Sequence, residues 1–395
     1  MDQPLQCPGF QAAGLAAGIK KNGNPDLGLI YSPAPAALAG MFTRNRVAAA
    51  PVQLCRSRLA QGVARAIIVN AGNANCCTGE KGLSDATTIC ADVSTHLGLA
   101  ENEVLPASTG VIGEPLPLDR IRAAIPGLVA ALSDEGFENA ARAMMTTDTV
   151  PKQVLRQFEI DGRIVTILAV AKGAGMIRPD MATMLCFICT DAALAADTLQ
   201  GVLARTVDRT LNRITIDGDT STNDTVLALA NGVSGVKVQS AAQVQAFAQA
   251  MNDILLEVAR RLVADGEGVT RVVDIIVKGA PSDADAQRIA EAVAHSPLVK
   301  TAIFGQDANW GRIMMAVGRA GVAIDPEAVD IYFNEVIMAR SGQGCGKAAE
   351  AQVTAVMRLP AYTVTIDLNA GSGRWTMITC DFSIDYVKIN ADYRS

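Results

Sequence analysis

The sequence predicts an α/β fold made of two domains. Runs rich in β-branched residues, such as ARAIIVN at 64–70, read as buried strands and alternate with segments of helical periodicity. At 395 residues the chain is long enough for two domains and a large core. The pattern starts afresh near residue 271, so we expect a main domain at 1–270 and a smaller α/β domain at 271–395.

The main domain is expected to begin with short strands and turns through residue 60, including LGLIY at 27–31. After the strand at 64–70, NAGNANCCTG at 70–79 is dense in small polar residues; this is typical of a surface loop but also suits a backbone-rich wall of a binding site. Ser84 is a candidate N-cap for the following helix. Residues 103–113 are predicted to form a strand, a turn and a second strand.

Two helices with apolar residues at helical spacing are predicted at 118–132 and 137–145. Asp161-Gly162 between two β-rich runs predicts a hairpin with a type I′ turn. The second strand of this hairpin leads into KGAGMIRPDMATML at 172–185, and MLCFIC at 184–189 reads as a buried strand. A helix is expected around 199–211, and the longest amphipathic helix starts near residue 240 and stops at Asp265-Gly266.

The second domain is predicted to contain a strand at VVDIIVKG, a helix at 283–293 and a strand at LVKTAIFG, residues 298–305. Trp310 and Arg312 are placed near the start of a further helix. The segment SGQGCGK at 341–347 imitates a phosphate-binding loop. However, only three residues separate Gly342 from Gly346, and the required Ser or Thr after the lysine is absent, so we do not predict nucleotide binding there.

Composition argues against several classes of partner. The net charge is −6 and aromatic residues make up 4%, so neither a basic surface nor stacking platforms for nucleic acid are evident. The apolar runs fall short of the ~18 residues that span a bilayer, and the first residues do not resemble a signal peptide. Nine cysteines without framework spacing fit reduced thiols. We therefore expect a cytoplasmic protein with neither nucleic-acid nor membrane partners.

Metal and histidine chemistry also find little support. His96 and His295 are the only histidines, too few for a His-based triad or a multi-His metal site. Cys186 and Cys189 form a CxxC, but within a strand their side chains would point to opposite faces. A calcium loop starting at Asp217 is excluded because the glycine and the glutamate that an EF-hand loop requires are both missing. We expect no metal.

Three positions could carry the chemistry of a nucleophilic enzyme. Thr183 follows a loop shaped by glycines and a proline and lies at the head of a buried strand, where a hydroxyl could act as a nucleophile or simply belong to an ordinary loop. Thr109-Gly110 offers a hydroxyl and an unobstructed backbone N–H, as an oxyanion hole needs, or is merely a turn. Glu267, beyond a helix C-terminus, opposes the helix dipole, which favours either a cationic ligand or a solvated loop acid.

The segment KGAGMIRPDMATML closely resembles the self-cleavage motif of the ornithine acetyltransferase family, the glutamate N-acetyltransferases of arginine biosynthesis. Seven further segments resemble family signatures in the expected order: NAGNANCCTG, STGVIG, TTDTVPK, ITIDGDTSTNDT, DGEGVTR, GQDANWGRIMMAVGRAG and the final KINADYRS. Together they span nearly the whole chain.

The resemblance implies a layered αββα-type main domain like that of N-terminal-nucleophile enzymes, with a C-terminal tail that returns to the active site. It also implies that the precursor cuts itself between Ala182 and Thr183, giving an α segment of 182 residues and a β segment of 395 − 182 = 213. These segments would assemble as α2β2. The new α-amine, with a reference pKa of about 7.7 to 8.0, could serve as the base that the scarce histidines do not supply.

The activity implied by the resemblance is ping-pong acetyl transfer through Thr183, from N-acetylornithine to glutamate, without a cofactor. Thr109 and Gly110 would hold the oxyanion. The implied substrate contacts are Thr149, Lys172, Thr183, Glu267, Asn390 and Ser395. Lysine pairs naturally with a substrate carboxylate and glutamate with a substrate ammonium. No motif decides whether acetyl-CoA is a second acetyl donor.

Three residues depart from the family pattern: Arg178, Asp180 and the terminal Ser395, which still keeps a hydroxyl. Arg178 and Asp180 could alter the cleavage rate or form a weak local ion pair. Two other functions remain open from the sequence. One is an aminopeptidase or amidase that uses the same self-cleavage but releases its product to water, and the other is an unprocessed binding protein with the same fold.

Overall fold

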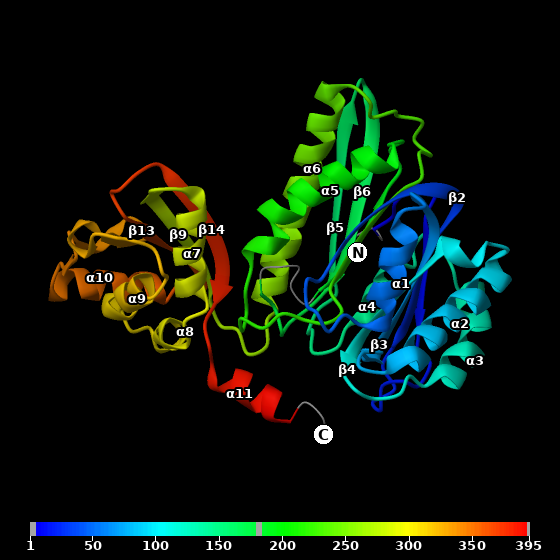
Figure 1. The fold of residues 1–395 in the computed structure, drawn as a ribbon, viewed down its shortest axis with the longest axis horizontal. Helices are drawn as coiled ribbons and strands as arrows, with labels where there is room; N and C mark the ends of the chain where they lie inside the picture. Colours follow the sequence, from blue (N-terminus) through cyan, green and yellow to red (C-terminus); the bar gives the residue numbers. More distant parts are fainter. Residues whose placement is uncertain (1–4, 179–183, 393–395) are drawn as a thin grey trace. The chain divides into compact units, whose positions relative to one another are not determined.

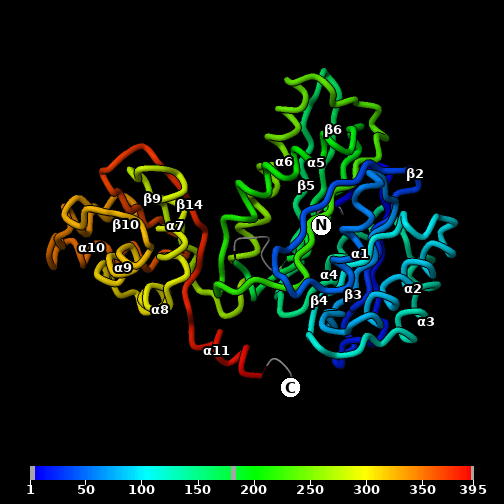
Figure 2. Tube along the Cα trace, viewed as in Figure 1, coloured from blue at the N-terminus to red at the C-terminus, as the bar shows by residue number. Residues whose placement is uncertain are grey.

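The computed structural model describes residues 5–178 and 184–392. They belong to two compact units, shown in Figures 1 and 2. The first unit comprises Met1–Asn212 and Asp219–Leu262, and the second comprises Arg213–Gly218 and Val263–Ser395. Each unit combines helices with its own β-sheet, so the α/β class predicted from the sequence is confirmed.

The first unit is built on an eight-stranded sheet in the order β4-β3-β2-β8-β7-β6-β5, with β1 paired to β2. The strands are β1 Gln11–Leu15, β2 Leu27–Phe42, β3 Val63–Asn73, β4 Val104–Val111, β5 Lys152–Ile160, β6 Arg163–Lys172, β7 Leu185–Thr190 and β8 Thr225–Ala230. The β3–β4 and β7–β8 pairs are parallel, whereas the other neighbours are antiparallel.

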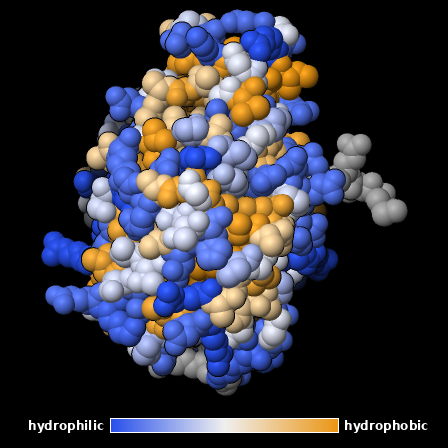
Figure 3. Space-filling model, turned by 90° about the vertical axis from the view of Figure 1, so that its right-hand side faces the viewer, coloured by the Kyte–Doolittle hydropathy of each residue, from blue (hydrophilic) through white to orange (hydrophobic). Residues whose placement is uncertain are grey.

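Helices cover both faces of this sheet. They are α1 Ala50–Leu59, α2 Gly79–Leu97, α3 Leu118–Ala130, α4 Phe137–Met144, α5 Ala196–Arg209 and α6 Ala241–Ala264, with short 3-10 turns at Glu101–Glu103 and Leu211–Arg213. Successive residues of a strand face opposite sides. Accordingly, Leu29 packs in the core formed with α2 and α3, and Ile30 packs in the core formed with α4. Figure 3 views the α2–α3 side, where polar and apolar residues are interspersed.

Several sequence predictions for this unit are confirmed. The buried run at 64–70 lies in β3, residues 185–189 of MLCFIC lie in β7, and the helices predicted from 118 and 137 are α3 and α4. The hairpin also forms: β5 pairs with β6, and Asp161 and Gly162 have φ values of 50° and 75°, as a type I′ turn requires. No helix in the described ranges is long and apolar enough to cross a membrane.

The prediction of short strands and turns through residue 60 is wrong in two respects. β2 is one strand of 16 residues, and residues 50–59 form the helix α1. Pro51 lies in the first turn of α1, where a missing N–H costs nothing because that donor has no partner inside the helix.

Two other local predictions are corrected by the structure. Ser84 is not an N-cap, because α2 begins at Gly79 and already includes it. Residues 104–111 form the single strand β4 instead of two strands around a turn. The parallel pairing with β3 continues through Thr109 and Gly110, and the register of the two strands shifts between Gly72 and Asn73.

The second unit has a six-stranded sheet in the order β12-β11-β10-β13-β9-β14. The strands are β9 Val272–Ala280, β10 Asp330–Phe333, β11 Val336–Arg340, β12 Gln343–Gly344, β13 Ala361–Asp367 and β14 Gly373–Cys380. The helices are α7 Asp283–Ala294, α8 Pro297–Gly305, α9 Trp310–Gly318, α10 Lys347–Met357 and α11 Ile384–Ala391, with a 3-10 turn at Pro326–Ala328. β9, α7 and the start of α9 agree with the sequence predictions.

The predicted strand at 298–305 is wrong, since these residues belong to the helix α8. Ser296 caps this helix by accepting a hydrogen bond from the Val299 N–H, and Pro297 occupies its first turn. Short apolar runs with β-branched residues fit either a strand or a buried helix. Here the cap and the proline were the local signals that distinguished the two.

Candidate active site

Thr109 and Gly110 lie in β4, where it runs parallel to β3 and is opposite Ala71 and Gly72. Gly110 has a φ of 134°, and a Cβ atom built on it would lie 2.3 Å from the carbonyl carbon of Gly72. Both the positive φ and this close approach of two strands require glycine. The Thr-Gly pair is therefore a distorted stretch of strand instead of a free turn.

Replacing Gly110 by alanine is expected to destabilise the protein by at least about 1 to 3 kcal/mol, because the added methyl group meets backbone atoms that cannot move aside. Gly113→Ala is the matched control. Gly113 also has a positive φ, of 86°, but a Cβ there would meet nothing within 4 Å. Thermal unfolding should show the larger loss for Gly110→Ala; equal losses would contradict the steric explanation.

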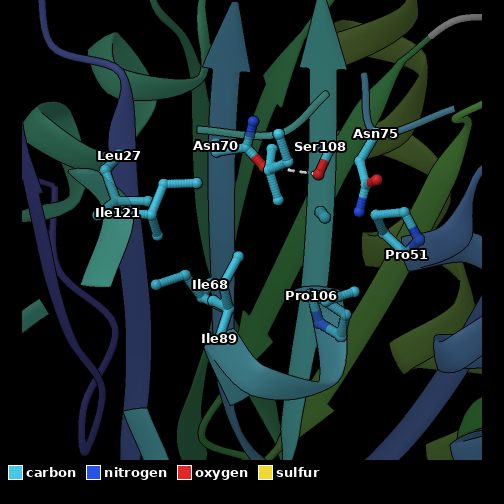
Figure 4. Close-up of a pocket in the computed structure, with 12 residues that line it drawn as sticks. Leu27, Pro51, Ile68, Asn70, Asn75, Ile89, Pro106, Ser108 and Ile121 are labelled. Carbon is cyan, nitrogen blue, oxygen red and sulfur yellow. Dashed lines mark hydrogen bonds between the residues drawn. The ribbon is translucent and has the colours of Figure 1, made fainter. Parts of the chain in front are cut away.

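Ser108 precedes Thr109 and faces the opposite side of the sheet. Its hydroxyl donates a hydrogen bond of 2.6 Å to the Asn70 side-chain oxygen, as Figure 4 shows, in a small pocket that also includes Ile89 of α2. Asn223 donates to the Ser108 carbonyl at 2.8 Å and to the Ala74 carbonyl at 2.6 Å. These contacts hold Ser108 in place, and with it the end of β4 that carries Thr109.

On the other face, Thr109 meets the buried side chain of Lys172 at the end of β6. The Lys172 ammonium donates to the Thr109 hydroxyl at 3.2 Å and to the Thr146 hydroxyl at 2.8 Å. An ammonium can only donate, so the Thr109 oxygen must accept. The hydroxyl proton of Thr109 is thereby left to point toward a different acceptor, which is the orientation that oxyanion stabilisation requires.

Asp148, which our sequence reasoning did not single out, holds this cluster together. Its Oδ1 accepts from the Lys152 ammonium and from the Gly173 N–H, both at 2.6 Å. Burial opposes its ionisation, but Lys172, Lys152 and the Gly173 N–H outweigh that effect and hold the pKa of Asp148 well below its usual value. The residue lies within TTDTVPK, but nothing local in that motif predicts a contact with the chain at 173.

Asp224 is a second buried carboxylate that sequence reasoning missed. Its Oδ1 accepts from the Met184 N–H at 3.0 Å, and the Met184 carbonyl accepts from the Thr225 N–H at 3.1 Å. Its Oδ2 is buried and has no hydrogen-bond partner among the described residues. Burial raises the pKa of Asp224 well above its usual range, against the opposing effects of the Met184 N–H and Lys172. Asp148 and Asp224 thus fix the chain at Gly173 and at Met184, on either side of residues 179–183.

A model of the ArgJ family matches residues 11–395. The chain belongs to the ArgJ family. It is 51% identical to the arginine biosynthesis bifunctional protein ArgJ of Geobacter sulfurreducens, covering 99% of this chain and 100% of the relative. The ArgJ protein of Syntrophotalea carbinolica is 48% identical, with 98% and 99% coverage. A crystal structure of the ArgJ protein of Bacillus halodurans is 36% identical, has a TM-score of 0.51, and covers 53% of this chain and 99% of that one.

The family predicted from the motifs is therefore confirmed, and its expected site residues fall into two groups in this ArgJ-family chain. Thr109, Gly110, Lys172 and Thr149 belong to the first unit, and Thr149 is exposed directly after Asp148. Of these, Lys172 and Thr109 are in direct contact. The remaining predicted positions Ala182, Thr183 and Ser395 lie outside the described residues, as does Asp180.

Glu267 and Asn390 belong to the second unit and contact each other. The Asn390 side-chain NH2 donates to Glu267 Oε2 at 2.8 Å, and only 7% of Glu267 is exposed. Ser383 caps α11, the helix that carries Asn390, by accepting from the Tyr386 N–H. The amide donor is neutral, so this contact orients the Glu267 carboxylate and leaves its negative charge in place.

The nine cysteines of this ArgJ-family chain are free thiols, as the sequence predicts. Cys186 and Cys189 are buried in β7, and burial raises the pKa of Cys186 to about 12. Within residues 5–178 and 184–392, no group of three or more His, Cys, Asp or Glu side chains could hold a metal ion.

Thiol alkylation of the native protein is expected to modify Cys77 and Cys345 first, because these two are exposed and the other seven are buried. Peptide mass spectrometry after brief treatment with iodoacetamide at pH 8 measures this order. Complete labelling after denaturation is the control. Early labelling of Cys186 or Cys189 in the native protein would contradict the burial of β7.

Proposed function

We propose that this chain is an acetyltransferase of arginine biosynthesis that moves the acetyl group of N-acetylornithine to glutamate. The observation that carries the proposal is the match to the ArgJ family over residues 11–395, together with the 51% identical relative named an arginine biosynthesis bifunctional protein. The buried Lys172–Thr109 contact supports it, since it supplies an ammonium for a substrate carboxylate beside an oriented hydroxyl donor.

The nucleophile of the proposal is Thr183, made available by self-cleavage. Its hydroxyl attacks the carbonyl carbon of Ala182, the peptide nitrogen leaves as the acyl group shifts to oxygen, and water hydrolyses the resulting ester. The new α-amine of Thr183 then takes the proton of its own hydroxyl; roughly a tenth or more of such amines are unprotonated at neutral pH. The α and β segments are proposed to stay together as α2β2.

Acetyl transfer then takes two half-reactions. The Thr183 oxygen attacks the carbonyl carbon of the acetyl group of N-acetylornithine, and ornithine leaves with the proton held by the α-amine. The amine of glutamate then attacks the acetyl ester, and the Thr183 oxygen leaves and regains its proton. Each attack creates a tetrahedral oxyanion, for which the Thr109 hydroxyl and the Gly110 N–H are the proposed donors. Lys172 is proposed to pair with a substrate carboxylate and Glu267 with a substrate ammonium, with further contacts from Thr149, Asn390 and Ser395.

The test follows the acetyl group. Purified protein is supplied with N-acetylornithine carrying a labelled acetyl group and with glutamate, and the label is expected in N-acetylglutamate. Label released as acetate would instead indicate an amidase, and unchanged substrate would indicate a binding protein. Repeating the assay with labelled acetyl-CoA determines whether this chain also uses the second donor, as the word bifunctional in the relatives' names suggests.

Asn390→Ala is expected to lower kcat/KM for acetyl transfer by about 10- to 100-fold, because a hydrogen bond to a charged group contributes about 1.5 to 3 kcal/mol. The lost contact is the 2.8 Å hydrogen bond that orients the Glu267 carboxylate. Steady-state kinetics measure the change. Lys388→Ala, on the same helix and pairing with the exposed Asp385 at 3.1 Å, is the control and should stay near wild type. Equal effects of the two variants would contradict a role for Asn390.

A further inference from the structure

Asp148, Lys152 and Lys172 form a buried charged cluster in the first unit. The side chains of Lys152, Asp148 and Lys172 are 1%, 0% and 4% exposed. Two of the three residues come from neighbouring strands, since Lys152 begins β5 and Lys172 ends β6, and Lys152 is paired with Ala171. A fully buried carboxylate is stable only when cations and hydrogen-bond donors surround it.

The two oxygens of Asp148 are used unequally. Oδ1 is engaged at 2.6 Å by both the Lys152 ammonium and the Gly173 N–H. Oδ2 accepts from the Thr146 N–H at 3.0 Å and lies 3.8 Å from the Lys172 ammonium, beyond hydrogen-bond distance. Lys172 is attracted by the carboxylate but donates hydrogen bonds to the hydroxyls of Thr146 and Thr109.

We propose that Asp148, with Lys152 as its counter-cation, is a positioning residue that directs Lys172 toward the Thr109 hydroxyl. Lys152 and the Gly173 N–H occupy Oδ1, whereas the Lys172 ammonium pairs with Oδ2 at 3.8 Å, too far for a hydrogen bond. Lys172 therefore feels the charge of Asp148 and keeps its hydrogen bonds to the Thr109 and Thr146 hydroxyls. The Gly173 N–H, held by the same carboxylate oxygen, ties this arrangement to the chain that leads toward residue 183. The inference rests on the proposed function, because its readout is acetyl transfer.

The charges around Lys172 support this role. Asp148, Lys152, Lys20 and Asp224 all interact electrostatically within the cluster, and burial favours the protonated form of Asp224. Asp148 is then the ionised carboxylate that balances the lysines. Removing it would leave Lys172 facing Lys152 and Lys20 without that anion, which favours the neutral amine.

The test compares pH profiles of Asp148→Asn, Lys152→Met and the double variant, with activity expressed per correctly processed chain from intact-mass measurement. Asp148→Asn is expected to lose about 10²-fold in kcat/KM. Its pH profile should also fall at alkaline pH, where the wild-type profile does not, as Lys172 loses its proton. Lys152→Met is expected to lose about tenfold without a new pH limb. The double variant should regain about tenfold over Asp148→Asn, because the repelling charge is gone.

A merely structural role predicts a different result: lower thermal stability, no new alkaline limb and no recovery in the double variant, and that outcome overturns the inference. If Asp148→Asn does not fold, Thr146→Val tests the orientation of Lys172 with all charges kept. A loss of about tenfold in kcat/KM that Thr146→Ser restores supports the inference, whereas wild-type kinetics of Thr146→Val overturn it. Lys81→Met is the matched control, because Lys81 pairs at i,i+4 with the buried Asp85 in α2 at 2.7 Å. Absence of acetyl transfer in the wild type would refute the proposed function instead.

Discussion

The Thr183→Ala variant is expected to remain a single chain of 395 residues and to show no acetyl transfer. Alanine has no hydroxyl to attack the preceding carbonyl, so neither the ester intermediate of cleavage nor the acetyl ester of transfer can form. Intact-mass spectrometry measures the first effect and the labelled acetyl assay the second. Wild-type protein should instead give segments of 182 and 395 − 182 = 213 residues.

Thr183→Ser provides the matched control, since serine keeps a hydroxyl on the same carbon and should still cleave and transfer acetyl, at a reduced rate. Incubating purified Thr183→Ala with a catalytic amount of wild-type protein tests whether cleavage occurs within one molecule. An uncut wild-type chain with full transferase activity would refute the mechanism and leave the family assignment intact.

Sequence reasoning was most reliable where a pattern is local and periodic. The turn at Asp161-Gly162 and the strands on both sides of it follow from two adjacent residues that accept positive φ and from β-rich flanks. The errors arose where the residues that mark helix and strand ends were ambiguous. Residues 50–59 were predicted to belong to short strands and turns but form α1, whose first turn accommodates Pro51. The β-branched run of α8 was predicted as a strand, although Ser296 and Pro297 mark a helix start.

The candidate site was predictable only in part. Thr109, Gly110 and Lys172 could be named from motifs, but their meeting depends on tertiary contacts across 63 residues of chain. Asp148 and Asp224 reach Gly173 and Met184 across 25 and 40 residues. The contact between Thr109 and Lys172 depends on strand register, because a one-residue slip would turn either side chain to the other face of the sheet. Asp148 lies in the loop before β5 and Asp224 directly before β8, so their contacts depend on where the tertiary fold places these loop ends. The local sequence around Asp148 and Asp224 therefore does not predict the contacts that these carboxylates make.

Thr109→Val is expected to lower kcat for acetyl transfer by about 10² to 10³, the usual cost of removing one oxyanion donor. Valine keeps the shape and β-branching of threonine, so β4 and its pairing with β3 should survive, and the loss should appear in kcat more than in KM because the oxyanion exists only during reaction. Rapid-quench measurement of acetyl-enzyme formation separates the two half-reactions, and both should slow.

The alternative explanation for such a loss is that valine removes the acceptor that orients Lys172. Thr146→Val distinguishes the two, because Thr146 is the other hydroxyl that Lys172 contacts, at 2.8 Å, and it is not a proposed oxyanion donor. If Thr109 donates to the oxyanion, Thr109→Val should lose at least tenfold more kcat than Thr146→Val. Equal losses would mean that Thr109 acts only through Lys172, and the oxyanion would then have to be held by the Gly110 N–H without the hydroxyl.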